Sequence, residues 1–380
     1  MNPSNRKNYN RRPPDVLPQR SYLLPATIMS DPELIPHLPF DIALECFLRL
    51  PLYSLSTLPQ VCRSWRSVLS SPSFFETRRV KGHQTNLACM ILASPSAGSS
   101  KSPVYSVSIY DQKQDTWAVL PAIPDLPEGV PLFCSCVAVG TQLVLLGGWD
   151  PSSWSASDSV YIYDFVQARW RRGAPMPTAR SFFACAAEPG GRIVIAGGHD
   201  DNKNALRSAE VYDISADAWE TLPDMNEERD ECKAICCYGK VLIVSGFPTQ
   251  RQGQFVASAE SYDFQEKKWE VIDNFWPEGK PPSSIVSLDD QPYALLDGQL
   301  ARRKASEGVW QSVAAVPDAV KISAAVTVLS DGILIIGFGG STQPMGAVRW
   351  RAGGAASWES VAVGEGNLSI VHHRACTVQV

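Results

Sequence analysis

The chain has little histidine, little net charge and no long apolar run, and each shortage argues against a class of function. Five histidines in 380 residues do not favour an active site built on several imidazoles. The net charge of −5 predicts no basic face of the kind that binds nucleic acid. No run approaches the ~18–20 apolar residues of a membrane span, and the polar, proline-containing start has no signal-peptide pattern. We therefore expect no nucleic-acid partner and no membrane.

Catalytic motifs are missing as well. The chain holds no G-x-S-x-G, P-loop or H-E-x-x-H sequence. His199-Asp200-Asp201 could bind a metal, but no second histidine lies at ligand spacing, so a solvated loop is expected there. The pairs Cys134/Cys136 and Cys236/Cys237 lie in apolar runs and lack the paired C-x-x-C spacing of a zinc site. We expect buried, reduced cysteines, no metal or cofactor, and a protein that is not an enzyme.

What the chain does have is a repeat of about fifty residues. A Tyr-Asp pair recurs, and a tryptophan follows each tyrosine at a distance of seven residues. The tyrosines are Tyr110, Tyr163, Tyr212 and Tyr262, followed by Trp117, Trp170, Trp219 and Trp269, and Trp310 and Trp358 extend the tryptophan series. Two glycines close the preceding apolar run at 147–148, 197–198 and 339–340. Each repeat therefore predicts four short antiparallel strands.

This pattern resembles the kelch repeat, in which each unit forms one four-stranded blade of a β-propeller. The resemblance implies an all-β propeller over residues 85–380, with a loop missing from its fifth blade at Asp297-Gly298. The first blade lacks a first strand, and Arg374–Val380 resembles the first strands elsewhere, so we expect the C-terminal strand to close the ring and remove two open sheet edges. The six expected blades are 85–120 plus 370–380, 131–172, 180–222, 230–272, 283–314 and 321–361.

The region before the repeats divides into two parts. Residues 1–30 are polar, basic and punctuated by proline, which predicts a disordered tail. Residues 34–79 have a helical period instead. A helix is expected over Asp41–Arg49, stopped by Pro51, followed by a short helical piece around Leu52–Leu58. Pro59 suits the first turn of the next helix, which carries Val61, Cys62, Trp65, Val68 and Leu69 on one stripe. Pro72 is expected to end that helix.

The segment 34–79 resembles an F-box, on the marks Leu38-Pro39, Leu50-Pro51, Val61-Cys62-Arg63-x-Trp65-Arg66 and Pro72-x-Phe74. The resemblance implies binding to a Skp-type adaptor and, through it, to a cullin–RING ubiquitin ligase. The positions that meet the adaptor in this family correspond here to Leu38, Pro39, Ile42, Leu50, Pro51, Val61, Cys62 and Trp65. The alternative is a small helical cap on the propeller. However, about forty-five residues are too few to bury so many apolar side chains alone, whereas a partner groove would cover them.

Function in the propeller is expected to lie in the loops at one end. The loops after the glycine pairs and the segments that lead into each first strand should converge there. The candidate client-binding residues are Trp149, Trp154, Arg180, His199, Asp200, Arg229 and Arg374. For each, stabilising a loop or being an ordinary exposed charge is the alternative role. Arg180 and Arg374 occupy equivalent positions, which kelch domains use to meet acidic partner peptides.

Four further segments resemble the plant kelch-repeat F-box proteins: 131–134, Arg180–Cys185, Ala196–Ala205 and Glu228–Cys232. Members of that group direct phenylalanine ammonia-lyase, chalcone synthase or cytokinin response regulators to turnover. The resemblance implies the substrate-recognition subunit of an SCF-type ligase, in the cytoplasm, the nucleus or both. A kelch scaffold without a ligase role is the alternative, and a propeller enzyme is a third reading. The extended N-terminus and the weak fourth to sixth repeats leave the client open.

Overall fold

The computed structural model describes residues 34–380 apart from 56, 95–103, 127–128, 151–152, 282–283, 305–307, 341–343, 352–356 and 364–368, and gives no side-chain surroundings for 53, 94 and 369–374. The expected disordered tail, residues 1–30, lies outside this range. The chain divides into two compact units, Met1–Phe47 and Leu48–Val380. None of the described helices is long and apolar enough to cross a membrane.

The segment before the propeller is helical, as expected, but contains one helix more than the sequence predicts. Pro72 does not end a helix. It begins one, because Ser71 accepts a hydrogen bond from the backbone N–H of Phe74 as the N-cap and proline suits the first helical turn. The helical elements are α1 (Phe40–Leu48), α2 (Leu52–Leu55), the 3₁₀ turn η2 (Leu58–Gln60), α3 (Arg63–Leu69) and α4 (Pro72–Val80).

The buried guanidinium of Arg78 on α4 forms hydrogen bonds with the backbone at the end of α1 and after α4. The Arg78 side chain is fully buried, and its Nη1 donates to the carbonyl oxygens of Leu48 and Leu50 at 2.7 and 2.9 Å. Its Nη2 donates to the carbonyl of His83 at 2.9 Å. The Leu48 carbonyl ends α1, where the helix dipole is negative, so a guanidinium is stabilised at this place.

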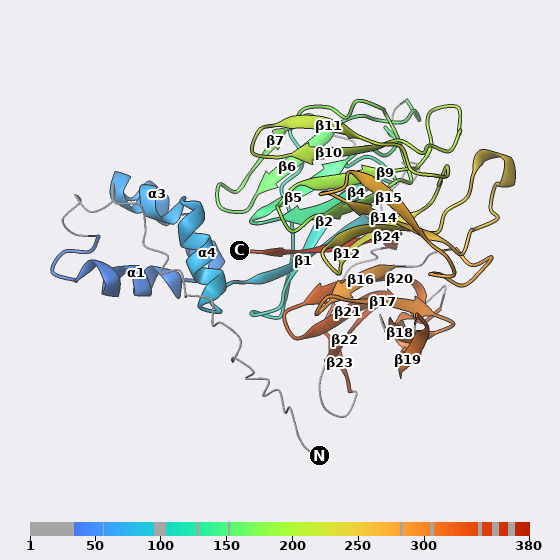
Figure 1. Ribbon diagram of the computed structural model, residues 1–380. Coiled ribbons are helices and arrows are strands. Elements are labelled where there is room, and N and C mark those ends of the chain that lie inside the picture. The colour runs from blue at the N-terminus through green and yellow to red at the C-terminus, as the bar shows by residue number, and fades with distance from the viewer. Residues whose placement is uncertain are drawn as a thin grey trace, which may run out of the picture. The chain divides into compact units, whose positions relative to one another are not determined.

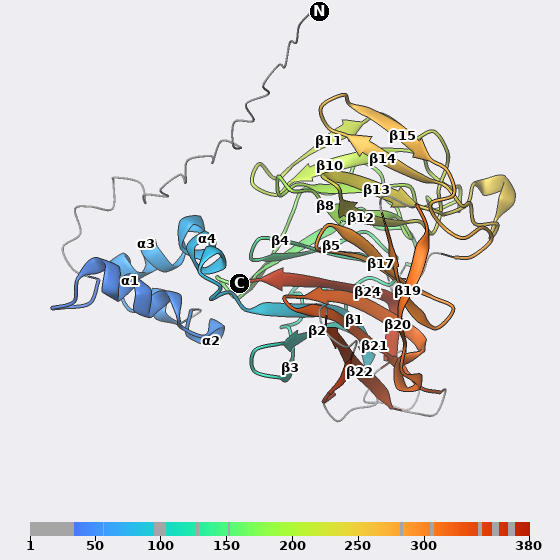
Figure 2. The same cartoon turned by 60° about the horizontal axis from the view of Figure 1, so that its bottom comes forward.

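Residues 86–380 form a six-bladed propeller of antiparallel four-stranded sheets, as the repeat predicts (Figures 1 and 2). The first three blades, each from its inner strand outward, are β24 (Ser369–Gln379), β1 (Asn86–Ser94), β2 (Val104–Asp111), β3 (Thr116–Val119); β4 (Ser135–Val139), β5 (Gln142–Leu146), β6 (Val160–Asp164), β7 (Arg169–Arg172); and β8 (Ala184–Ala187), β9 (Ile193–Ala196), β10 (Ala209–Asp213), β11 (Ala218–Leu222). The last three are β12 (Lys233–Cys237), β13 (Lys240–Val244), β14 (Ala259–Asp263), β15 (Lys268–Ile272); β16 (Ile285–Leu288), β17 (Gln291–Leu296), β18 (Gln299–Arg303), β19 (Trp310–Ala315); and β20 (Ile322–Leu329), β21 (Gly332–Phe338), β22 (Met345–Arg351), β23 (Trp358–Val361). Two further 3₁₀ turns, η3 (Thr249–Arg251) and η4 (Asp318–Val320), lie between strands.

The C-terminal strand closes the ring, which confirms the expected closure. β24 pairs antiparallel with β1, for example Leu87 opposite Val378, and the two strands run side by side in Figures 1 and 2. The inner strands β24, β4, β8, β12, β16 and β20 contact one another in that order and back to β24. Apolar clusters fill the spaces between blades; one joins Val144 of blade 2 to Ile193 of blade 3. Burial between blades offsets the instability of short isolated sheets.

The Tyr-Asp and tryptophan positions of the repeat have separate structural roles. The aspartate accepts hydrogen bonds from the next backbone N–H groups; Asp213, for instance, accepts from Ser215 and Ala216 at 2.8 and 3.0 Å, which fixes the turn. The tryptophan lies opposite the tyrosine in blades 1 to 4 and opposite Arg303 in blade 5, and it donates its indole N–H to a carbonyl on the side of the preceding blade. These interblade bonds, of 2.7 to 2.9 Å, are Trp117 to Ala362, Trp170 to Pro121, Trp219 to Ala174, Trp269 to Pro223 and Trp310 to Phe275.

The glycine pairs are required by close backbone contact. Gly197 and Gly198 have φ of 67° and 80°, a region that residues with a Cβ rarely adopt. A Cβ on Gly197 would lie 2.3 Å from the carbonyl oxygen of Arg229 in the next blade, and one on Gly198 would lie 2.4 Å from that of Ser181. The pair therefore lets two segments leading into first strands pack directly against the loop.

Blade 5 lacks this loop, as expected. Leu296 and Gln299 pair directly, and Asp297 and Gly298 between them both have positive φ, as a type I′ turn requires. The corresponding connections in blades 2 to 4 run from Gly147 to Ser159, Gly197 to Ser208 and Ser245 to Ser258. The end of the propeller that carries the glycine pairs is therefore asymmetric, with its long loops over blades 2 to 4.

Candidate functional site

The two sets of loops expected to converge do so at the glycine-pair end. In each of blades 2 to 4, the residue after the pair forms an antiparallel bridge with a residue that leads into the first strand. These bridges join Trp149 to Leu132, His199 to Ser181 and Phe247 to Asp230. We call the solvent-accessible part of the segments 131–134, 147–150, 153–159, 180–183, 197–208, 223–232 and 245–258 the glycine-pair end of blades 2–4.

Two of the candidate client contacts are not on that surface. Arg180 and Arg229 are 0% exposed, and each forms an ion pair with a buried glutamate of its own blade. Arg180 Nη2 donates to Glu210 Oε1 at 2.6 Å, and Arg229 Nε donates to Glu260 Oε1 at 3.0 Å. Burial raises the pKa of Glu210, and the Arg180 charge opposes that shift. The prediction that these arginines contact a client is wrong for both, because their guanidinium groups face the interior.

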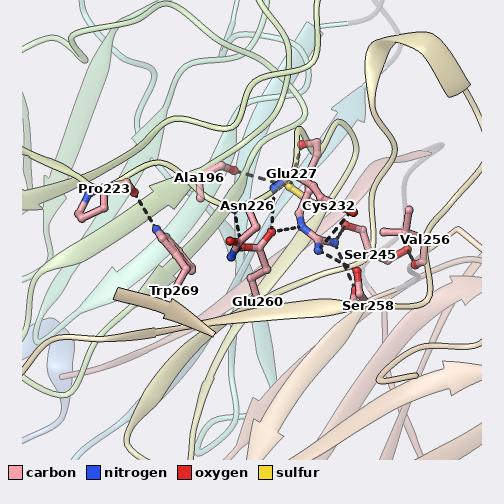
Figure 3. A network of polar contacts seen from close by, with 11 residues as sticks. Ala196, Pro223, Asn226, Glu227, Cys232, Ser245, Val256, Ser258, Glu260 and Trp269 are labelled. Atoms are coloured by element: carbon pink, nitrogen blue, oxygen red, sulfur yellow. Dashed lines mark hydrogen bonds and ion pairs between the residues drawn. The ribbon is translucent and has the colours of Figure 1, made fainter. Parts of the chain in front are cut away.

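Figure 3 shows the polar network around the second of these pairs, in which Ser245, Ser258, Asn226 and Glu260 lie close together. Arg229 Nη1 donates to the carbonyls of Ser245 and Ser258 at 2.9 and 3.2 Å, and its Nη2 donates to the Ser258 hydroxyl at 2.8 Å. The backbone and side-chain N–H groups of Asn226 donate to Glu260 Oε2 at 2.7 and 2.8 Å. These bonds hold the segment leading into β12 against two strands of the same blade.

A signal for these pairs exists in the sequence. Blades 3 and 4 read Ala209-Glu210-Val211-Tyr212-Asp213 and Ala259-Glu260-Ser261-Tyr262-Asp263, whereas blades 1 and 2 have Ser108 and Tyr161 in place of the glutamate. A glutamate on a buried strand requires a partner, and both blades that contain it also contain the arginine. Arg374 leads into a blade without that glutamate. Its side chain lies outside the described residues, so its role as a client contact stays a prediction.

A chain of hydrogen bonds crosses three blades at the glycine-pair end. Trp149 Nε1 donates to Ser181 Oγ at 2.8 Å, Ser181 Oγ lies 2.8 Å from His199 Nε2, and His199 Nδ1 lies 2.9 Å from the Asp230 carboxylate. An ionised carboxylate only accepts, so His199 Nδ1 donates to Asp230, while Nε2 is bonded to the Ser181 hydroxyl. The order Ser-His-Asp is that of hydrolase triads. Here Ser181 is 0% exposed and already accepts from an indole, so the chain positions Trp149 rather than activating a nucleophile.

Aromatic side chains form a partly exposed patch beside this chain of hydrogen bonds. We call Phe133, Trp149, Trp154 and Phe182 the aromatic patch. Phe133 lies 4.4 Å from Phe182 and 5.3 Å from Trp149 between ring centroids. The His199 ring stacks on Phe182 at 5.3 Å, and Trp149 lies 6.5 Å from Trp154, which is 61% exposed. Two expected client contacts, Trp149 and Trp154, therefore lie together in this patch. The third, His199, is buried and contacts the patch by stacking on Phe182.

Asp200 has a local role in its loop. Its carboxylate accepts from the backbone N–H groups of Asn202 and Asn204, each at 2.9 Å, and from the Asn204 amide at 3.1 Å. Partial burial raises the pKa of Asp200. The hydrogen bonds from Asn204 and Asn202 together lower it by more, so the pKa lies below its usual value. The side chain remains partly exposed, so its predicted contact with a client stays a prediction. Among the residues that the structure describes, no group of three acidic, histidine or cysteine side chains could hold a metal ion.

The first compact unit contains three of the expected adaptor contacts. Pro39 and Ile42 are exposed, Ile42 at 48%, and Leu38 is partly exposed. In contrast, Ala43 and Phe47 on the same helix are buried. Ile42 therefore leaves a large apolar side chain exposed in the middle of a short helix, which is typical of a surface that a partner covers.

The second unit contains the other five. Val61 is 62% exposed, Cys62 is exposed, and Leu50, Pro51 and Trp65 are partly exposed. The expected stripe of five apolar residues is thus not one buried face. Cys62 is the N-cap of α3, its Sγ accepting from the N–H of Trp65 at 3.4 Å, and only Val68 and Leu69 are buried. The early half of the stripe is exposed and the late half belongs to the core.

The fold and the two sets of exposed side chains define a class of protein: a short helical motif with uncovered apolar residues, followed by a closed six-bladed propeller of kelch type. A family model described as the F-box domain matches residues 35–77. A second, described as the KLHDC2/KLHL20/DRC7 Kelch-repeats domain, matches residues 94–289.

Similar proteins share both parts. F-box/kelch-repeat protein At1g80440 of Arabidopsis thaliana is 38% identical over 317 residues, covering 81% of this chain and 88% of the relative. F-box/kelch-repeat protein At1g15670 of the same plant is 35% identical over 338 residues, covering 84% and 92%, and SKIP20 is 39% identical over 286 residues, covering 64% and 68%. The chain belongs to the F-box/kelch-repeat family. None of these three names states a client.

A likeness to a solved structure supports the fold alone. The chain described as "Structure of YjhT" superposes with a TM-score of 0.54 at 12% identity, covering 70% of this chain and 96% of that one. The kelch-repeat prediction is therefore confirmed at the level of family and architecture.

Proposed function

We propose that this protein is the substrate-recognition subunit of an SCF-type cullin–RING ubiquitin ligase. The F-box binds a Skp-type adaptor, and the propeller binds a client that is then ubiquitinated and degraded by the proteasome. The observation that carries the proposal is the exposure of apolar side chains at F-box motif positions, above all Val61 at 62% and Ile42 at 48%. Side chains of this size in water favour a partner that covers them.

Rate enhancement in such a complex comes from proximity. Holding a client lysine near a charged conjugating enzyme replaces a bimolecular encounter by a high local concentration. No residue of this chain needs to touch the reacting thioester, which agrees with a propeller whose Ser-His-Asp chain is sealed from solvent. The client binds at the glycine-pair end of blades 2–4. An enzyme of phenylpropanoid metabolism or a signalling regulator, in the cytoplasm or nucleus, is the client class that the resemblance implies.

Co-expression of the full chain with a Skp-type adaptor, followed by gel filtration, tests the proposal. Val61→Glu is the sharpest variant because the side chain is exposed and its loss does not disturb the core. Val271→Glu is the matched control, since Val271 is 49% exposed on the outer strand β15 of the propeller. We expect co-elution with the unmodified chain and with Val271→Glu, and its loss with Val61→Glu and with the Trp65→Ala, Pro39→Ala double variant.

Two results would overturn the proposal. Normal adaptor binding by both Val61→Glu and the double variant would remove the F-box motif as the binding surface. Absence of co-elution from a well-folded unmodified chain would favour a kelch scaffold that binds partners without a ligase.

A further inference from the structure

One residue in each of blades 2, 3 and 4, just before the first strand at the glycine-pair end, has an unusual backbone conformation with positive φ. Phe133, Phe182 and Glu231 occupy the same position in blades 2, 3 and 4, directly before the residues Cys134, Phe183 and Cys232. Their φ angles are 58°, 57° and 54°, a region that residues other than glycine rarely adopt. The same uncommon conformation therefore recurs at one position in three successive blades, where two side chains are aromatic and the third is acidic.

The aromatic patch already carries a cation from its own chain. Lys203, on the loop of blade 3, places its Nζ 5.9 Å from the centroid of the Trp149 ring. Cations are attracted to the faces of aromatic rings by the ring quadrupole, and an arginine, with its planar guanidinium, also stacks on them. The hydrogen bond to Ser181 fixes the orientation of the Trp149 ring, and Phe133 and Phe182 pack against one another beside it.

The charge of the surface has the matching sign. The accessible carboxylates of the glycine-pair end are Asp150, Asp158, Asp200, Asp201, Asp224, Glu227, Glu228 and Glu231, whereas Asp230 is buried against His199. The accessible cations of the same segments are Lys203, Arg207 and Arg251, and Arg207 is already paired with Asp224 at 3.0 Å. Arg180 and Arg229 do not alter this balance, because each is buried against its own glutamate. The accessible surface is therefore acidic, and a surface of this sign attracts basic segments and repels acidic ones.

Glu231 continues the row formed by Phe133 and Phe182, and it directly follows Asp230, whose carboxylate lies 2.9 Å from Nδ1 of the His199 ring that stacks on Phe182. We propose that the glycine-pair end of blades 2–4 docks a basic segment of the client, in which an arginine lies against Phe182 and Trp149 and pairs with Glu231. This inference rests on the proposed function and specifies its client. It reverses the polarity expected from the sequence, which assigned exposed arginines and an acidic peptide to this surface.

Fluorescence anisotropy on the full chain in complex with a Skp-type adaptor tests the inference. The probe is a short fluorescein-labelled peptide in which arginines alternate with glycine, serine and leucine. Two comparison peptides replace every arginine by citrulline, which keeps the shape without the charge, or by glutamate. We expect the arginine peptide to bind at least about tenfold more tightly than the citrulline peptide and the glutamate peptide not to bind.

Four variants assign the binding to this surface. Glu231→Gln is expected to weaken the arginine peptide about tenfold, and Phe182→Leu several-fold, because leucine fills the space without a ring face. Lys203→Gln is expected to strengthen binding about twofold or more, since it removes a like charge from Trp149; a merely damaged surface would not show a gain. Glu220→Gln is the matched control, because Glu220 is an exposed carboxylate on the outer strand β11, and should change nothing.

Each other outcome overturns the inference. These are tighter binding of the glutamate peptide, equal binding of the citrulline peptide, no binding of the arginine peptide up to about 1 mM, or binding that Glu231→Gln and Phe182→Leu leave unchanged. Failure of the proposed function is seen separately. If the adaptor does not co-elute but the arginine peptide binds as expected, the docking surface holds and the ligase assignment fails.

Discussion

The buried ion pair of Arg229 and Glu260 gives a sharp test of how this propeller is built. Both side chains are 0% exposed, and the guanidinium donates to Glu260, to two carbonyls and to a hydroxyl. Arg229→Met keeps the apolar length but leaves the Glu260 carboxylate buried without a counter-charge. Removing one partner of such a pair costs about 3–5 kcal/mol, which in a domain of this size lowers the melting midpoint by roughly 5–8 °C.

The assay is thermal unfolding at a fixed scan rate, since large propellers unfold irreversibly and the midpoint then depends on that rate. Arg207→Met is the matched control. Arg207 pairs with Asp224 at 3.0 Å, but its side chain is 58% exposed, and an exposed pair contributes less than about 1 kcal/mol. The double variant Arg229→Met, Glu260→Gln should recover part of the loss, because the uncompensated charge is then gone.

A different result would refute the reasoning. If Arg229→Met melts within the range of Arg207→Met, the buried network does not stabilise the blade. If it also loses client binding at an unchanged midpoint, the earlier reading of Arg229 as a client contact is restored.

Two further predictions concern the ring and its charged end. Deleting residues 369–380 removes β24 and leaves β1 as an open edge at the axis, so the truncated chain should be insoluble; a soluble monomer with an unchanged melting midpoint would contradict closure by this strand. Burial, followed by the neighbouring Asp230, raises the pKa of Glu231 above its usual 4.5, while Lys233 and His199 oppose the shift. Because only the ionised carboxylate attracts a cation, binding of the arginine peptide should weaken as pH falls from neutral toward that raised pKa. In Glu231→Gln the part of this pH dependence due to the carboxylate should vanish, and an identical pH profile in the variant would show that Glu231 is not its source.

The architecture could be predicted from the sequence because its signals are local and repeated. The Tyr-Asp pair fixes a turn through hydrogen bonds that span three residues, as Asp213 shows, and the tryptophan pairs with the tyrosine across one hairpin. Four such units, with two further tryptophans in phase, leave few alternatives to a propeller. The missing loop at Asp297-Gly298 was equally readable, since a two-residue turn is decided by those residues alone.

The candidate site was predicted less well, because its errors concern burial. Arginine is enriched in binding surfaces, so Arg180 and Arg229 read as contacts. Their partners Glu210 and Glu260 are 30 and 31 residues away in the chain, and only the blade geometry brings them within bonding distance. The helix α4 was missed for a local reason: Pro72 was taken as a helix end, although Ser71 before it supplies the N-cap of a new helix.

The number of blades, the strand that closes the ring and the F-box before it could all be predicted from local patterns, because periodicity and turn chemistry act over a few residues. The sign of the charge at the glycine-pair end could not be predicted in this way. Whether a charged side chain faces solvent or a buried partner depends on contacts between strands that are distant in the chain. Two arginines face inward here, so eight accessible carboxylates and the aromatic patch remain at the glycine-pair end of blades 2–4.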